Sequence, residues 1–204
     1  MTPDRWHRLM RQLDTPDSDD VYSELVAAYA EKHRHYHTNE HIEDCLQQFD
    51  TSANLAQQPA EVELALWFHD AVYDPMSQDN ERRSADWSRQ FLAAAGADPN
   101  RCDRVYDHIM ATRHEPGELE GDAALVVDVD LSILGRDQAT YDAFENNVRR
   151  EYRWVPSALF RKKRAEILQS FLDRDAIYTT AAFHERYEDA ARRNIEAAIG
   201  ALQQ

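Results

Sequence analysis

The segment from Pro59 to about Tyr73 constrains the fold of this chain more than any other. Its apolar residues recur at helical spacing, and His69 falls on the same face as Val62 and Leu66. A proline suits the first position of such a helix. Because a face of this kind packs into the interior, the sequence predicts a core helix that directs the imidazole of His69 inward.

Most other segments also carry helical signals, and the sequence predicts an all-α, single-domain helical bundle over residues 1–204. The stretch 125–129 is short and β-branched, as in a buried strand, but no partner strand is evident elsewhere, so we expect a short buried helix. The break around Pro116 is expected to be a connector within the bundle. The expected helices cover about 3–13, 19–29, 38–49, 59–73, 79–95, 99–113, 122–135, 138–154, 157–174 and 180–202.

Composition and charge narrow the classes of protein to which this chain can belong. The 204 residues suffice for one domain with a substantial core, and no apolar run approaches the roughly 20 residues that span a bilayer. The first residues lack the pattern of a signal peptide. Cys45 and Cys102 lack metal-type spacing and suit reduced thiols in a cytoplasmic protein, although a disulfide between them stays open. A net charge of −15 argues against broad nucleic-acid binding.

Four residues with metal-ligating side chains lie in three separate apolar segments: His41, His69, Asp70 and Asp130. Two imidazoles and two carboxylates suit one divalent transition metal ion, such as Mn, Fe, Co, Ni or Zn, better than calcium. His37 precedes His41 by one helical turn, so either could be the first ligand. Asp128 could likewise exchange roles with Asp130. Each of these residues alone also fits an ordinary place in a helical protein.

The order of these residues resembles the HD superfamily of metal-dependent phosphohydrolases, in which an isolated histidine precedes a His-Asp pair and a distant aspartate. Within that superfamily, the chain is similar to a subfamily of predicted hydrolases. The similarity covers most of the chain, through 34–42, 67–74, 79–81 and 128–135, and then Arg149, Glu151, Tyr152, Ala191, Arg192 and Asn194. The resemblance implies that His41, His69, Asp70 and Asp130 hold the metal.

The resemblance also implies an enzyme that uses a metal-activated water to cleave a phosphate ester or anhydride, with a nucleotide as the expected substrate. The candidate catalytic residues are Asp70, Asp74 and Glu81. Asp74 follows Asp70 by four residues, on the same face of the expected helix, and a carboxylate in reach could orient the water or transfer a proton. Glu81 could instead only favour the start of the next helix. The candidate substrate-binding residues are Arg34, His37, Arg113, His114 and Arg149.

Two other classes of function fit the same residues. One alternative is a non-catalytic module that keeps the metal site and binds or senses a nucleotide without turning it over. The other is a structural helical protein whose histidines are core or surface residues. Metal analysis separates the structural protein from the first two, and turnover separates the enzyme from the binding module. Aromatic residues in the C-terminal helices suit either a core or a homodimer interface.

Overall fold

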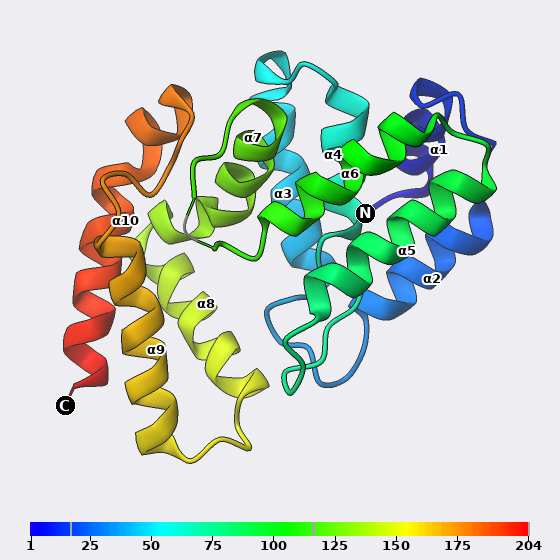
Figure 1. Ribbon diagram of the computed structural model, residues 1–204. Helices are drawn as coiled ribbons and strands as arrows, with labels where there is room; N and C mark the ends of the chain where they lie inside the picture. The colour runs from blue at the N-terminus through cyan, green and yellow to red at the C-terminus, as the bar shows by residue number, and fades with distance from the viewer. Residues whose placement is uncertain (17, 116, 204) are drawn as a thin grey trace. The chain divides into compact units, whose positions relative to one another are not determined.

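The computed structural model describes residues 1–16, 18–115 and 117–203, and the regular structure within them is entirely helical (Figure 1). This confirms the predicted all-α class. Pro116, at the centre of the predicted connector, lies outside the described residues. The elements are α1 (Pro3–Gln12), α2 (Asp19–Tyr29), α3 (Asn39–Asp50), the 3₁₀ turn η1 (Ala53–Leu55), α4 (Pro59–Phe68), α5 (Asn80–Ala94), α6 (Pro99–Ala111), α7 (Gly121–Asp130), the 3₁₀ turn η2 (Leu131–Gly135), α8 (Gln138–Glu151), α9 (Ser157–Leu172) and α10 (Ala181–Leu202).

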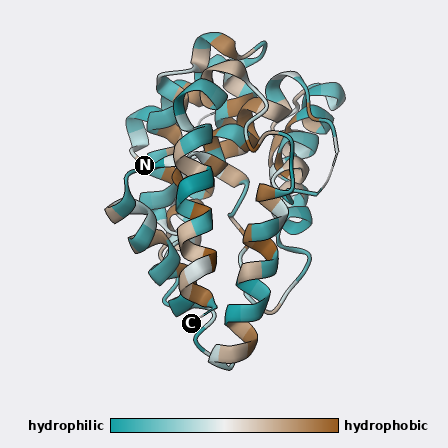
Figure 2. Ribbon diagram, turned by 90° about the vertical axis from the view of Figure 1, so that its left-hand side faces the viewer, coloured by the Kyte–Doolittle hydropathy of each residue, from teal (hydrophilic) through white to brown (hydrophobic). Residues whose placement is uncertain are grey.

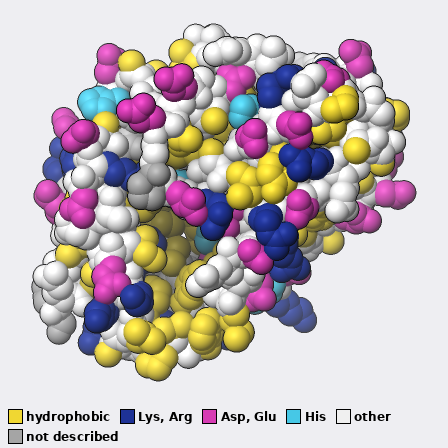
Figure 3. Space-filling view, viewed as in Figure 1, with side chains coloured by type: hydrophobic (Ala, Val, Ile, Leu, Met, Phe, Trp, Pro, Cys, Tyr) yellow, Lys and Arg dark blue, Asp and Glu magenta, His cyan; other side chains and the backbone are white. Residues whose placement is uncertain are grey.

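Backbone contacts divide the chain into two compact units, residues 1–130 and 131–204. The single domain over 1–204 stays a prediction. Hydrophobic and hydrophilic residues are interleaved along the helices (Figure 2), and acidic and basic side chains are mixed on the surface (Figure 3). Within the described ranges, no helix has both the length and the apolar composition to cross a membrane.

The helix α4 forms the centre of the first unit. Every side chain from Glu61 to Phe68 is buried, and the helix packs against α1, α3, α5, α6 and α7. Its two acidic residues are buried because arginines pair with them: Arg104 holds the Glu61 carboxylate through two hydrogen bonds of 2.7 Å, and Arg5 donates to Glu63 at 2.7 Å. A helix that is buried on all sides fixes the position of whatever follows its C-terminal end.

The predicted extension of this helix to Tyr73 is wrong, because α4 ends at Phe68 and His69 caps it. The apolar pattern continues past this point, but side chains bond the last carbonyl groups and so stabilise the stop. The His69 ring donates to the Leu66 carbonyl at 3.0 Å, and the Tyr29 hydroxyl donates to the Trp67 carbonyl at 3.0 Å. His69 and Asp70 therefore lie at a helix end and not within a helix.

The second unit is organised around the turn η2, which packs against α8 and α10. The Asn194 side chain on α10 donates to the carbonyls of Leu134 and Arg136, at 2.8 and 2.9 Å. Gly135 ends the turn directly against Tyr187, and a β-carbon there would lie 2.5 Å from the Tyr187 Cβ. Only glycine therefore lets the turn approach α10 this closely.

Candidate metal centre

Three side chains from three helices place their donor atoms around one point in the first unit. His41 lies in the first turn of α3, His69 caps α4, and Asp130 is the last residue of α7. The His41 Nε2 atom is 3.2 Å from His69 Nε2 and 3.3 Å from Asp130 Oδ1, and His69 Nε2 is 3.5 Å from Asp130 Oδ1. Ligand atoms about 2.1 Å from a shared ion, at angles of 90–110°, are separated by roughly 3.0–3.4 Å. Two of the three separations lie within this range and the third exceeds it by 0.1 Å, so the arrangement is close to that around a divalent metal ion.

Asp70 adds a second carboxylate beside the same imidazoles. Its Oδ2 atom is 3.1 Å from His69 Nε2 and 3.5 Å from His41 Nε2. The structure thus places Asp70 beside the other three side chains that the resemblance assigns to the metal, although the group whose donor atoms could hold an ion contains Cys45 and not Asp70. Asp128, the alternative to Asp130, is fully buried at an earlier position on α7.

Cys45 was missed as a candidate ligand by the sequence reasoning. The donor atoms of four residues, His41, Cys45, His69 and Asp130, all lie within 4.8 Å of one another and could hold a metal ion. Cys45 follows His41 by one turn of α3 and is buried. The sequence signal was this spacing of four residues, which places two ligating side chains on one helix face.

Hydrogen bonding fixes the orientation of His69. Its Nδ1 atom is 3.0 Å from the Leu66 carbonyl, and because a carbonyl only accepts, Nδ1 carries a proton. The other nitrogen, Nε2, therefore faces the carboxylates and is free to offer its lone pair when the ring is neutral. A backbone carbonyl on the outer nitrogen is a common partner of metal-ligating histidine.

The electrostatic environment favours a cation at this point. Both carboxylates lie at helix C-terminal ends, Asp70 just beyond α4 and Asp130 at the end of α7, where the helix dipole disfavours negative charge. Burial disfavours these carboxylates further, yet the surrounding imidazoles outweigh it and hold the pKa of each carboxyl well below its ordinary value. A positive charge is therefore required to keep both carboxylates ionised.

The pKa values of the two imidazoles are shifted in the opposite direction, upward. Burial lowers the pKa of His41, but Cys45, Tyr36 and hydrogen bonds to the carboxylates outweigh it and raise that pKa well above its ordinary value. Burial likewise lowers the pKa of His69, and the two carboxylates raise it well above its ordinary value. Without a metal, protonated imidazoles therefore keep the carboxylates of the cluster ionised.

Two further histidines border the cluster. His114, in the left-handed region with φ 54°, places Nε2 3.1 Å from the outer oxygen of Asp130, and its side chain is 24% exposed. His37 is half-buried and stacks on Tyr73 with ring centroids 4.2 Å apart, and its charge helps to lower the pKa of Asp70. Between the two candidates for the first ligand, the structure places His41, and not His37, in the group that could hold a metal.

Arg34, one of the predicted substrate-binding residues, is bonded to the backbone of the same chain. Its side chain is fully buried and donates to the carbonyls of His37 at 3.2 Å, Asp70 at 2.7 Å and Ala71 at 3.0 Å. A fourth bond joins it to the Glu31 carboxylate at 3.0 Å. The guanidinium therefore holds the segment that carries Asp70 and has no surface to offer a phosphate.

The carboxylate of Asp74 also departs from its predicted position. The residue follows the end of α4, so it does not share a helix face with Asp70, and it is exposed. Its backbone exchanges two hydrogen bonds with the Asn80 side chain, at 3.0 and 2.9 Å, which pins the loop to the start of α5. Glu81 lies in the first turn of α5, and its catalytic role stays a prediction.

The other predicted arginines differ in their surroundings. Arg149 is a residue of the second unit, where it donates to the carbonyls of Tyr152 at 2.6 Å and Val155 at 3.0 Å and so closes the end of α8. Arg113 is exposed beside His114 and pairs with Glu115 at 3.0 Å. Of these two arginines, only Arg113 has a solvent-exposed guanidinium and lies beside His114, which contacts the cluster.

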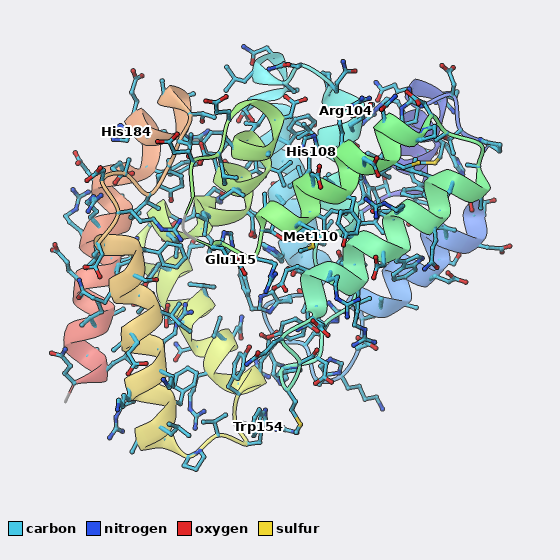
Figure 4. All side chains as sticks on the ribbon, in the orientation of Figure 1. Arg104, His108, Met110, Glu115, Trp154 and His184 are labelled. Carbon is cyan, nitrogen blue, oxygen red and sulfur yellow. The ribbon has the colours of Figure 1, made fainter. Side chains whose placement is uncertain are left out.

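A separate histidine, His108, lies on α6 one turn after Arg104 (Figure 4). It is 8% exposed, and neither ring nitrogen has a hydrogen-bond partner among the described residues. Burial lowers its pKa, so the ring is neutral. It does not belong to the group that could hold a metal.

The sequence matches no model of a known protein family, no curated protein and no solved structure at a significant level. The resemblance to HD phosphohydrolases therefore stays a prediction. The structure supports a coarser statement, which is that this is a helical protein with a largely buried group of histidine, cysteine and aspartate side chains that could hold a metal ion.

Proposed function

We propose that this chain is a metal-dependent phosphohydrolase that cleaves a phosphate ester or anhydride, with a nucleotide as its substrate class. The proposal of metal dependence rests on four side chains that converge on one point: His41, His69, Asp70 and Asp130. The Nε2 atoms of the two imidazoles lie 3.2 Å apart, and each lies 3.1–3.5 Å from an oxygen of Asp70 and an oxygen of Asp130. The choice of phosphate chemistry rests on the resemblance in the order of these residues.

Each residue of the cluster and its border has a separate role in the proposed reaction. A divalent transition metal bound there would supply an acidified water and neutralise negative charge on a phosphoryl group. The Asp70 carboxylate is 16% exposed and is the group that we assign to orienting the attacking water. His37 and His114 border the cluster on half-buried side chains, so we assign both to the phosphate, for which His114 would exchange its contact with Asp130 for one with a phosphate oxygen. Arg113 directly precedes His114 in the sequence, and its guanidinium is exposed to solvent.

The alternative is a module that binds a nucleotide at the metal site without turnover. One observation favours it: Arg34 and Arg149, two of the three arginines predicted to hold phosphate, are bonded to backbone carbonyls. With fewer cations at the site, stabilisation of the transition state would depend on the metal and the two histidines. Turnover by the metal-loaded protein separates the alternatives.

The test begins with metal content and then asks for turnover. Protein purified without chelators or an affinity histidine tag is analysed for metals, then incubated with Mn, Co, Ni or Zn and a panel of nucleotides and phosphate esters. We expect about one metal ion per chain and metal-dependent phosphate release. The His69→Ala variant should lose both. The matched control is His184→Ala, which removes an exposed histidine of α10 (Figure 4) and should change neither.

The outcomes of this test are distinct. Metal binding without turnover of any compound in the panel would favour the binding module. A wild-type protein that binds none of the four ions would contradict both, because the cluster would then be a buried network of ion pairs.

A further inference from the structure

Cys45 has a position that its ordinary role as a small core residue does not require. Its Sγ atom lies 3.7 Å from Nδ1 and 3.8 Å from Nε2 of His41, one turn earlier on α3. It also lies within 4.8 Å of the donor atoms of His69 and Asp130. The residue is 2% exposed, so the thiol is enclosed with the imidazoles and a carboxylate.

We infer that Cys45 is a further metal ligand, which adds a thiolate to the imidazoles and carboxylates of the cluster and gives the site a preference for thiophilic ions such as Zn²⁺ and Co²⁺ over Mn²⁺. This inference rests on the metal site of the proposed function and deepens it. It concerns which ion the site holds, and it is independent of which phosphate compound is cleaved.

The thiol lies beside the expected position of the ion and would have to turn toward it to bind. With metal–sulfur and metal–nitrogen distances of about 2.3 and 2.1 Å and angles of 90–110°, sulfur and nitrogen are separated by roughly 3.1–3.6 Å. The separation of 3.8 Å between Cys45 Sγ and His41 Nε2 exceeds this range, and the nearly equal 3.7 Å to Nδ1 shows that the sulfur does not lie along the lone pair of Nε2. Binding would therefore require the cysteine side chain to rotate toward the Nε2 side of the His41 ring.

The chemistry of the donor explains the expected preference. A thiolate is a soft ligand that binds Zn²⁺ and Co²⁺ well, whereas Mn²⁺ prefers oxygen ligands. On binding, the thiol releases its proton to solvent and sulfur donates an electron pair to the ion. A site with only His41, His69, Asp70 and Asp130 as ligands would lack this source of discrimination.

Cobalt provides a direct readout that does not depend on activity. Protein stripped of metal is titrated with Co²⁺ while bound cobalt and the near-ultraviolet absorption are measured together, because a cobalt–thiolate bond produces a charge-transfer band there. We expect the band in the wild type and in Cys102→Ser, which removes the only other cysteine. We expect Cys45→Ser and Cys45→Ala to bind cobalt without the band.

Competition between ions provides the second readout. In the Cys45 variants, Zn²⁺ affinity should fall by at least about tenfold, while Mn²⁺ affinity should change by less than about threefold. Cobalt bound to the wild type without the charge-transfer band would overturn the role of Cys45 and leave the metal site in place. Failure of the wild type to bind cobalt, zinc and manganese would overturn the inference together with the proposed function.

Discussion

Replacement of Arg34 by methionine tests whether a buried arginine holds the metal-binding segment in place. The guanidinium donates to the carbonyls of His37, Asp70 and Ala71 and to the Glu31 carboxylate, with a fully buried side chain. Methionine keeps much of the volume but removes all four bonds. A hydrogen bond to a charged group contributes about 1.5–3 kcal/mol, and water can reach part of this site, so we expect a loss of about 3–5 kcal/mol in the free energy of unfolding.

The same substitution should weaken metal binding, although Arg34 is not a ligand. Because the bonds to the carbonyls of Asp70 and Ala71 fix the position of the Asp70 carboxylate, their loss should reduce metal affinity by about 10–100-fold. Arg34→Lys keeps the charge but cannot form the planar fork, so it should fall between the wild type and methionine.

Urea unfolding of the metal-free protein and metal titration measure the two effects separately. The matched control is Arg113→Met, which removes an exposed arginine with a single ion pair to Glu115. It should change the free energy of unfolding by less than about 0.5 kcal/mol. The reasoning would be refuted if Arg34→Met unfolded with a free energy within about 1 kcal/mol of the wild type, because three buried or partly buried carbonyls cannot lose a charged donor at so small a cost.

Other measurements test the cluster and the second unit. The pKa values of His41 and His69 are raised in the metal-free protein, so their contribution to stability is fully present below about pH 6.5 and is lost as the pH rises through the raised values. Urea unfolding in the presence of a chelator should therefore show stability falling above about pH 6.5, and a flat profile in that range would contradict the assigned ion pairs. The pKa values of the two carboxyls are lowered, so their contribution is present above about pH 4 and is lost as the pH falls through the lowered values, which acid unfolding should show. Gly135→Ala should destabilise the second unit by about 1–3 kcal/mol, because the new methyl group would meet Tyr187. Gly200→Ala, in the last turn of α10 where a β-carbon would meet no other atom within 4 Å, should instead stabilise it by up to about 0.5 kcal/mol in thermal unfolding, and equal effects of the two would refute the packing argument.

The sequence predicted the helices well where local chemistry sets their limits. Asp98 and Asp137 accept hydrogen bonds from backbone amides at the starts of α6 and α8, and Pro59 and Pro99 occupy the first helical positions. The end of α4 was missed by five residues. Its apolar pattern continues, and the groups that stabilise the stop include Arg34, which is distant in the chain.

The site shows the same division between local and distant information. The residue types and their order were enough to predict four side chains that the structure brings together. Cys45 was hidden because a single cysteine among apolar neighbours has the pattern of a core residue. Composition likewise does not reveal whether a guanidinium faces solvent or, as that of Arg34 does, the backbone of the same chain.

The charges of the cluster suggest how a protein without its metal could keep this geometry. In the metal-free protein, raised pKa values keep the imidazoles of His41 and His69 protonated, and lowered pKa values keep Asp70 and Asp130 ionised, so two positive charges face two negative ones. A divalent ion that displaces both imidazole protons leaves the same total charge, and the loss of the Cys45 proton inferred above would lower it by one. Protons therefore act as substitutes for the metal, and the helix ends do not need to move apart when it is absent. This balance also explains why two carboxylates can lie at helix C-terminal ends, where the helix dipole opposes them.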